Sequence, residues 1–358
     1  MKNDFLKWLL PIVILLNACG KDDVKPITTV LTAAKGLYVL SEGGSDTKLG
    51  YYNLATGAFT GDFYRQQNSD DLGQTGNDML QYGSKLYIVM NVSSNITVLN
   101  AANAALIKRI DFKTGSGAKK FPRYAIGYKN NIYVSSTKDS SVTVIDTASL
   151  SIVKTISVGP NPEGMAIVGN SLYVANSGGY NFIDGPDSTI SVVNLSTQIE
   201  INRIKIGTKN PQKIEANSVG DLYVSGYGDF GAVPASVSVI SSATNTVKKE
   251  LGPDFPYAFV RICKDVAYFY NNYGGAGTSK VYNTITNALV RSEFVSDGTV
   301  ITTPYGLNVD EQSGDVYIND AKDYTSSGFV TCFDKDGKKK FLFSVSPGVN
   351  PNKVLFIR

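Results

Sequence analysis

Apolar and polar residues alternate in short runs along most of this chain, and one run recurs seven times. In each recurrence an apolar residue precedes a tyrosine that further apolar residues follow. The tyrosines are Tyr38, Tyr87, Tyr133, Tyr173, Tyr223, Tyr268 and Tyr317. They lie 40 to 50 residues apart, a period typical of four-stranded propeller blades and too long for collagen or heptad repeats. The pattern predicts an all-β fold, a seven-bladed β-propeller.

The residues between these runs predict the other strands of each blade. A second apolar run follows a polar loop, and its alternation, as in Val142–Asp146, is typical of a strand with a neighbour on each face. A third run follows a tight turn such as Thr56-Gly57. The innermost strand should begin after a punctuating proline, which breaks the incoming strand. These prolines are Pro122, Pro162, Pro211, Pro256, Pro304 and Pro351, with Gly76–Met79 in the equivalent place of the second repeat. Each blade is therefore expected to have four antiparallel strands.

The run after Pro351 begins a blade that the chain does not complete. We expect this C-terminal strand to join the blade that contains Leu37–Val39, which would close the ring and remove an open sheet edge. Pro26–Val30 is the competing candidate for the same position. We favour the C-terminal run because it is the more apolar of the two and no other predicted strand would pair with it.

The N-terminus has the layout of a signal peptide. Lys2 and Lys7 precede an apolar stretch, Leu9–Leu16, which is too short to span a bilayer. Ala18-Cys19 resembles a bacterial lipobox, in which the cysteine is acylated and becomes the new N-terminus. Acyl chains there would anchor the protein to a membrane. Ordinary cleavage that leaves Cys19 unmodified is the alternative.

The chain is thus expected to divide into three parts. Residues 1–18 would be the lipoprotein signal peptide, 19–34 the lipidated cysteine with an export linker, and 35–358 the propeller. The other cysteines, Cys263 and Cys332, fall in apolar strands of different blades, so we expect buried thiols and no disulfide.

Charge and composition narrow the range of functions. Lysine and arginine number 34 against 31 acidic residues, and no basic run exceeds Lys338–Lys340, so nucleic acid is not an expected partner. The chain has no histidine, which excludes a Ser-His-Asp triad and His-ligated metal sites. Asp78 and Glu163 remain as a carboxylate pair that could face each other as in a glycosidase. We expect a protein that is not an enzyme and has no cofactor.

A ligand site is expected where the loops entering the innermost strands and the loops after the tyrosine runs emerge together, around the mouth of the central channel. Tyrosine and asparagine dominate these positions, which suits a ligand with flat apolar area and scattered hydrogen-bonding groups. The candidate ligand-binding residues are Asn77, Asp78, Arg123, Tyr124, Glu163, Asn176, Gln212, Tyr227, Tyr257, Asn272, Tyr273, Tyr305 and Asn352.

Together these features resemble a known family. The segments Leu37–Gly43, Tyr51–Gly57 and Gly76–Met79 are similar to those of Bacteroidetes surface lipoproteins with a YncE-like seven-bladed propeller, and within these to the BtuG group. The likeness covers roughly residues 35 to 358. Gly20–Asp23 resembles the acidic signal that sends such lipoproteins to the outer face of the outer membrane.

The resemblance implies a cell-surface protein of the outer membrane that binds cobalamin or a related corrinoid and delivers it to a TonB-dependent transporter. A corrin is a wide, flat, amide-fringed macrocycle that a mouth rich in tyrosine and asparagine would fit. A propeller that binds a glycan or a surface protein is the alternative, because one fold serves many ligands.

Overall fold

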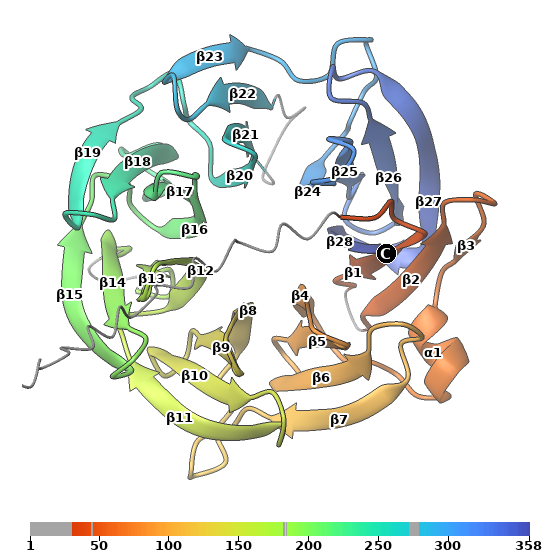
Figure 1. Ribbon diagram of the computed structural model, residues 1–358, viewed down its shortest axis with the longest axis horizontal. Helices are drawn as coiled ribbons and strands as arrows, with labels where there is room; N and C mark the ends of the chain where they lie inside the picture. The colour runs from red at the N-terminus through yellow and green to blue at the C-terminus, as the bar shows by residue number, and fades with distance from the viewer. Residues whose placement is uncertain (1–30, 44–45, 182, 184, 272–278) are drawn as a thin grey trace, which may run out of the picture. The chain divides into compact units, whose positions relative to one another are not determined.

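The computed structural model describes residues 31–43, 46–181, 183, 185–271 and 279–358. Within the compact unit Thr32–Arg358, seven four-stranded antiparallel sheets are arranged in a ring (Figure 1), which confirms the seven-bladed β-propeller. Pro26–Val30 and Cys19 lie outside the described residues. Among the described residues, no helix combines the length and the apolar character needed to cross a bilayer.

The two inner strands of each blade line and surround the channel. The innermost strands, from the first blade to the seventh, are β28 (Pro351–Ile357), β4 (Gly76–Tyr82), β8 (Pro122–Tyr128), β12 (Pro162–Val168), β16 (Pro211–Ala216), β20 (Phe259–Cys263) and β24 (Pro304–Val309). The second strands are β1 (Gly36–Ser41), β5 (Lys85–Met90), β9 (Asn131–Ser136), β13 (Ser171–Asn176), β17 (Asp221–Gly226), β21 (Val266–Tyr270) and β25 (Val316–Asp320).

The two outer strands complete the blades. The third strands are β2 (Lys48–Asn53), β6 (Asn95–Asn100), β10 (Ser141–Asp146), β14 (Thr189–Asn194), β18 (Ser236–Ser241), β22 (Lys280–Asn283) and β26 (Ser327–Phe333). The outermost strands are β3 (Phe59–Thr60), β7 (Leu106–Asp111), β11 (Ser151–Ser157), β15 (Ile199–Lys205), β19 (Thr246–Glu250), β23 (Ala288–Arg291) and β27 (Lys339–Val349). The short helix α1 (Phe63–Asn68) follows β3.

The recurrent tyrosine lies on the second strand of every blade, where its ring is buried. Several of these tyrosines also reach the next blade through the hydroxyl group. The Tyr173 hydroxyl donates to Asn245 Oδ1 at 2.7 Å, the Tyr223 hydroxyl donates to the Thr284 carbonyl at 3.2 Å, and the Tyr133 hydroxyl accepts from Gln198. Tyrosine at this position therefore fills the space between blades, and in these three blades it also supplies a polar link across it.

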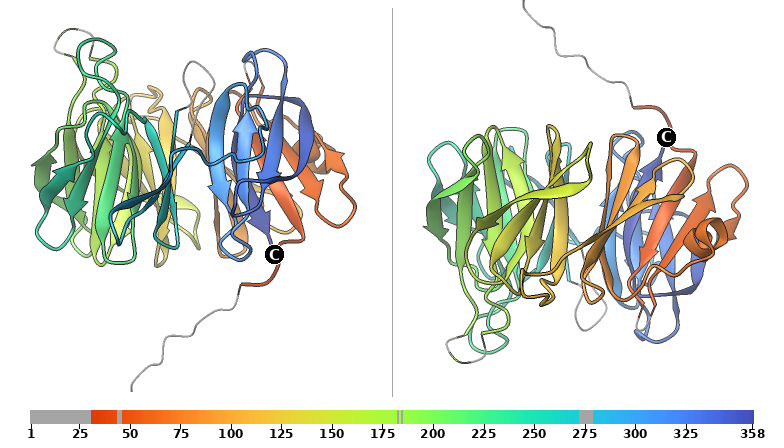
Figure 2. Two further views of the ribbon diagram at one scale, coloured as in Figure 1. Left: turned by 90° about the horizontal axis from the view of Figure 1, so that it is seen from above. Right: turned by 90° about the horizontal axis from the view of Figure 1, so that it is seen from below.

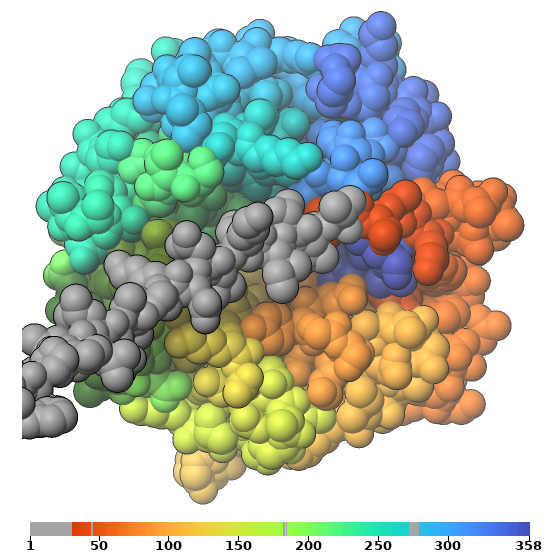
Figure 3. Space-filling view, in the orientation of Figure 1, coloured from red at the N-terminus to blue at the C-terminus, as the bar shows by residue number. Residues whose placement is uncertain are grey.

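The hydrophobic core is divided into seven clusters, one at each junction between neighbouring blades. In the space-filling view, side chains fill the space between adjacent blades (Figure 3). Cys263 and Cys332 are buried and free, as the sequence predicted. Because all the clusters consist of residues from position 37 onward, the propeller has a complete core of its own.

The first blade combines the first three strands of the propeller with its last strand. β28 pairs antiparallel with β1, with Leu37 opposite Phe356 and Val39 opposite Val354, so the C-terminal run occupies the innermost position predicted for it. β28 ends beside the start of β1, where the Lys35 amide donates to the Ile357 carbonyl at 2.7 Å. Figure 2 shows the C-terminus on one face of the ring and the loops that follow β13 and β17 on the other.

Candidate functional site

Sharp turns carry the chain into the innermost strands at the face opposite the C-terminus. The residue before the strand has a positive φ in five blades, at Thr75, Phe121, Asn161, Asn210 and Asn350. Three of these residues are asparagine, which adopts the left-handed conformation at little cost. The rigid proline that follows four of them then sets the direction of the strand. Asn-Pro is therefore the local signal that builds this end of the channel.

In six of the blades a polar or tyrosine side chain directly follows the first residue of the innermost strand, and five of these six side chains line the cavity. Pairing with the second strand is irregular directly after the first residue of the strand, as between Pro122 and Ala125, and such a bulge re-aims the side chains beside it. The turns are tied down by neighbouring strands, for example through the Asn91 amide, which donates to the Pro122 carbonyl at 3.0 Å. The residues at this position are Asn352, Asn77, Arg123, Glu163, Gln212 and Tyr305.

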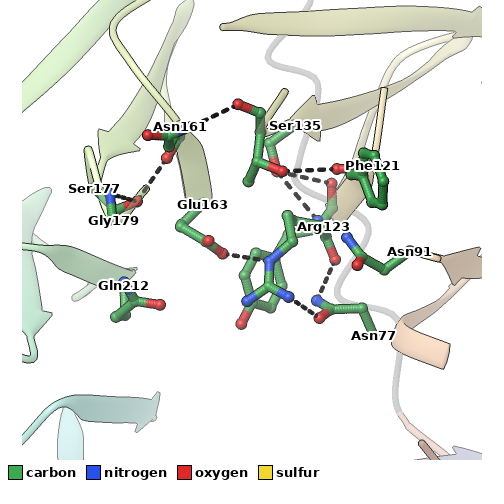
Figure 4. Close-up of polar contacts among 12 residues, drawn as sticks. Asn77, Asn91, Phe121, Arg123, Ser135, Asn161, Glu163, Ser177, Gly179 and Gln212 are labelled. Carbon is green, nitrogen blue, oxygen red and sulfur yellow. Dashed lines mark hydrogen bonds and ion pairs between the residues drawn. The ribbon is translucent and has the colours of Figure 1, made fainter. Parts of the chain in front are cut away.

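Blades one to four share a network of polar side chains, which we name the polar wall: Asn77, Asp78, Arg123, Glu163, Asn352 and Lys353. The Arg123 guanidinium lies between two of its members (Figure 4), donating from Nε to Glu163 Oε2 at 2.8 Å and from Nη1 to Asn77 Oδ1 at 2.6 Å. Lys353 Nζ donates to Asp78 Oδ1 at 2.9 Å, and the Asn352 amide donates to the Gly76 carbonyl at 2.7 Å. Each of these bonds joins one blade to another.

Blades five and six present aromatic rings to the same mouth, which we name the aromatic wall: Tyr227, Phe230, Phe259 and Tyr270. Successive rings are in contact, with centroids 5.6 Å apart for Phe230 and Tyr227, 5.6 Å for Tyr227 and Phe259, and 5.5 Å for Phe259 and Tyr270. Phe230 is 71% exposed, whereas Tyr270 is buried. The wall thus runs from the solvent into the channel.

A cavity of about 230 Å³ lies between the two walls. Its lining residues are Glu42, Asn77, Asp78, Arg123, Tyr124, Gln212, Lys213, Tyr227, Phe259, Tyr270, Tyr305, Asn352 and Lys353. Eight of the residues predicted from the sequence are in this set: Asn77, Asp78, Arg123, Tyr124, Gln212, Tyr227, Tyr305 and Asn352.

The other predicted residues lie elsewhere. Glu163 is behind the lining, bound to Arg123. Asn176 is completely buried, and its amide donates to Thr189 and Ser191. Tyr257 packs on Phe269 in the core between blades five and six. Asn272 and Tyr273 lie outside the described residues.

The displacement of Tyr257 from the mouth has a physical cause. In blade six the innermost strand begins at Phe259, three residues after Pro256, whereas Pro304 is itself the first residue of its strand. The strand pairing shows which residues of the two blades are equivalent. Phe259 pairs with Tyr270 in blade six, and Gly306 pairs with Asn319 at the same position of blade seven. The residue equivalent to Tyr305 is therefore Ala258. A shift of one residue turns a side chain to the opposite face of a strand, so Tyr257 enters the core.

The carboxylates around the mouth are already engaged. Lys353 and the Ala125 amide hold Asp78, and Arg123 holds Glu163. Glu42 accepts a hydrogen bond of 2.6 Å from the Tyr305 hydroxyl, and burial raises the pKa of Glu42. Burial likewise raises the pKa of Glu163, against the opposing charge of Arg123. Among the described residues, no cluster of carboxylates and cysteines could hold a metal ion.

Lys213, which follows Gln212 in the ring of residues around the mouth, is a further cation of the cavity lining. Its ammonium group lies 3.5 Å from the centre of the Tyr124 ring, and burial lowers the pKa of Lys213 to about 8. Because the folded state binds this proton less tightly than the unfolded chain does, folding is penalised below pH 8. The penalty disappears as the pH rises from about 8 towards the ordinary lysine value of 10.5.

We expect Lys213→Met to be more stable than the parent at pH 7, with the difference shrinking as the pH approaches 10. Methionine keeps the length of the side chain and removes the buried charge. Urea unfolding of both proteins at pH 7, 8.5 and 10 measures the difference. A difference that stays constant across this range would show that Lys213 titrates as an exposed lysine does.

Comparison with known proteins reveals the fold alone. No family model matches the sequence, and no curated protein matches it. A quinonprotein alcohol dehydrogenase-like protein from Bacteroides thetaiotaomicron is similar in structure, with 14% identity, a TM-score of 0.66 and coverage of 90% of this chain and 78% of that one. A functionally unknown protein from Desulfotomaculum acetoxidans has 8% identity, a TM-score of 0.65 and coverage of 91% and 99%.

Kuenenia stuttgartiensis hydrazine synthase is also similar, with 18% identity, a TM-score of 0.59 and coverage of 73% of this chain and 77% of that one. Some of these propellers are thus named as enzymes or as enzyme-like. At such low identity the likeness carries no activity over to this chain. What the chain shares with these proteins is the propeller fold.

Proposed function

We propose that this protein is a non-catalytic binding protein that captures vitamin B12 or a related corrinoid at the mouth of its channel. The observation that supports the proposal is the unlike character of the two walls, aromatic in blades five and six and polar in blades one to four. The flat face of a corrin would stack on the aromatic wall. Its amide groups would exchange hydrogen bonds with Asn77, Gln212 and Asn352.

The size of the cavity defines how such a ligand would bind. At about 230 Å³ the cavity is smaller than the roughly 300–1,000 Å³ of most small-molecule pockets. A corrinoid would therefore lie across the mouth and insert only one arm. Phe230 and Tyr180, which are 71% and 57% exposed, are the surface rings that a ligand lying across the mouth would cover.

The proposal includes a lipid anchor at Cys19, exposure at the surface of the outer membrane and transfer of the ligand to a TonB-dependent transporter. Thr32 accepts a hydrogen bond from Arg358, so the propeller begins at the face that carries the C-terminus. An anchor joined to that face would leave the mouth directed away from the membrane. The same exposed rings could instead stack on sugars, so a glycan is the second candidate.

Calorimetric titration of the chain from residue 24 with cyanocobalamin tests the proposal, with cobinamide and oligosaccharides titrated in parallel. We expect one-to-one corrinoid binding, and Phe230→Ala should weaken it about tenfold, because exposed aromatic anchors often contribute more than 1 kcal/mol. Val219→Ala is the matched control, because Val219 is equally apolar and 67% exposed in the turn between β16 and β17, away from the mouth. No heat with either corrinoid would reject the proposal, and heat with an oligosaccharide alone would favour the glycan.

A further inference from the structure

Lys213 brings a positive charge into the cavity without a partner for it. Among the described residues, its Nζ makes no ion pair and no hydrogen bond, and it lies against the face of the Tyr124 ring. The other lysine of the cavity, Lys353, is paired with Asp78. An ammonium group has several N–H donors, and those of Lys213 are available to a ligand.

Arg123 adds further donors beside the same ring. The centre of its guanidinium group lies 5.8 Å from the centre of the Tyr124 ring. Its Nε and one Nη1 hydrogen are used by Glu163 and Asn77, whereas Nη2 has no partner among the described residues. Both cations line the cavity, and each lies near the Tyr124 ring. Convergent unpaired donors on two cations are the arrangement that recognises oxyanions.

Asp78, Glu163 and Glu215 attract the charge of Lys213, but each of them is in direct contact with another cation. Each carboxylate beside the cavity has a partner of its own, Asp78 in Lys353 and Glu163 in Arg123. Glu215, deeper in the channel, is paired with Arg261. Glu42 is bonded to a hydroxyl group and buried. Within the part of the chain that the structure describes, no carboxylate therefore forms an ion pair with Lys213, and a ligand anion could take that place.

We propose that the cavity is an oxyanion subsite, in which a carboxylate or phosphate group of the ligand binds between Lys213 and Arg123. A group of this size fits a cavity of about 230 Å³. The inference deepens the proposed function and rests on it only for the identity of the whole ligand. The inserted arm of the ligand is then the one that carries the negative charge, and the aromatic wall receives the remainder.

Inorganic phosphate and acetate are the probes, each titrated calorimetrically into the chain from residue 24 at pH 7 and low chloride. We expect a dissociation constant of about 1 mM or lower for one of the two anions. The stronger of the two identifies the source of the charge as phosphate or carboxylate. Lys213→Met should weaken that binding about tenfold or more, because it removes a charge-assisted hydrogen bond.

Lys138→Met is the matched control. Lys138 is exposed in the loop after β9, on the face of the mouth but outside the cavity, so its removal subtracts the same charge at the surface. Affinity in this variant should stay within about twofold of the parent. Equal losses in the two variants, or no binding of either anion to the parent, would overturn the subsite.

Titration of the same proteins with cyanocobalamin separates this inference from the proposed function. If an anion binds in a way that depends on Lys213 but no corrinoid binds, the oxyanion subsite stands and the proposed corrinoid function is rejected. If a corrinoid binds but neither anion binds to the parent, the proposed function stands and the subsite is rejected. Because Lys213→Met is expected to be more stable than the parent, loss of binding in this variant would not arise from unfolding, and its urea transition checks this directly.

Discussion

Removal of residues 351–358 is expected to destabilise the propeller more than any single substitution. β28 supplies the inner partner of β1 and buries Val354, which is 3% exposed. Phe356 packs against Tyr317 with ring centroids 5.2 Å apart, and Leu355 packs against the core between the first two blades. At about 2 kcal/mol for each of these apolar side chains, the loss exceeds about 5 kcal/mol before any hydrogen bond is counted.

The truncated chain should therefore aggregate or lose its cooperative thermal transition, because it exposes the unpaired edge of β1. Differential scanning calorimetry and size-exclusion chromatography measure both effects. The control is removal of residues 1–31 at the other end of the chain, which should leave the transition unchanged, because all core clusters lie beyond that point. A truncated protein that is monomeric and melts with the parent would contradict the structural role assigned to β28.

Substitution of Arg123 by methionine should cost about 3–5 kcal/mol, the range found when one partner of a buried ion pair is removed. Glu163 is 5% exposed, and Arg123 is the cation that balances its charge. Removal of Arg123 also leaves the Asn77 amide oxygen without its donor. Chemical denaturation of the parent, Arg123→Met, Glu163→Met and the double variant forms the complete cycle.

The double variant should recover most of the loss, because it leaves neither charge unpaired. The pH dependence provides a second check. Burial raises the pKa of Glu163, and without Arg123 that pKa should rise further. The folded state then binds more protons than the unfolded chain above pH 4.5, so stability should fall as the pH rises. A cost in Arg123→Met that is the same at pH 5 and pH 8 would indicate that lost packing, not an uncompensated charge, is responsible.

The repeat made the architecture predictable from the sequence, since Tyr87 and its equivalents mark the same strand in each blade. The mouth was predictable to the extent that proline marks the first residue of a strand. Pro122, Pro211 and Pro304 do so, and Arg123, Gln212 and Tyr305 follow them at the cavity.

Where the proline does not begin the strand, the sequence could not indicate which way the next side chain points. Tyr257 is in the core for this reason, whereas Phe259 lines the cavity. Lys353 was not among the predicted residues. It takes the same place in the repeat as Asp78 and Lys213, directly after the pairing irregularity at the start of the innermost strand. The direction of a side chain next to a bulge depends on the pairing of strands that are distant in sequence.

The start of the propeller at Thr32–Lys35 lies beside its C-terminus, which has a consequence for engineering. The Lys35 amide bonds to the Ile357 carbonyl, and Arg358 bonds to Thr32, so a short linker could join the ends without disturbing either strand. New ends could then be opened at Gly115, an exposed residue between β7 and β8 where an added β-carbon would have no atom within 4 Å. Such a circular permutant would begin with an intact blade and contain β28 and β1 as neighbours in sequence, turning a contact between distant segments into a simple hairpin.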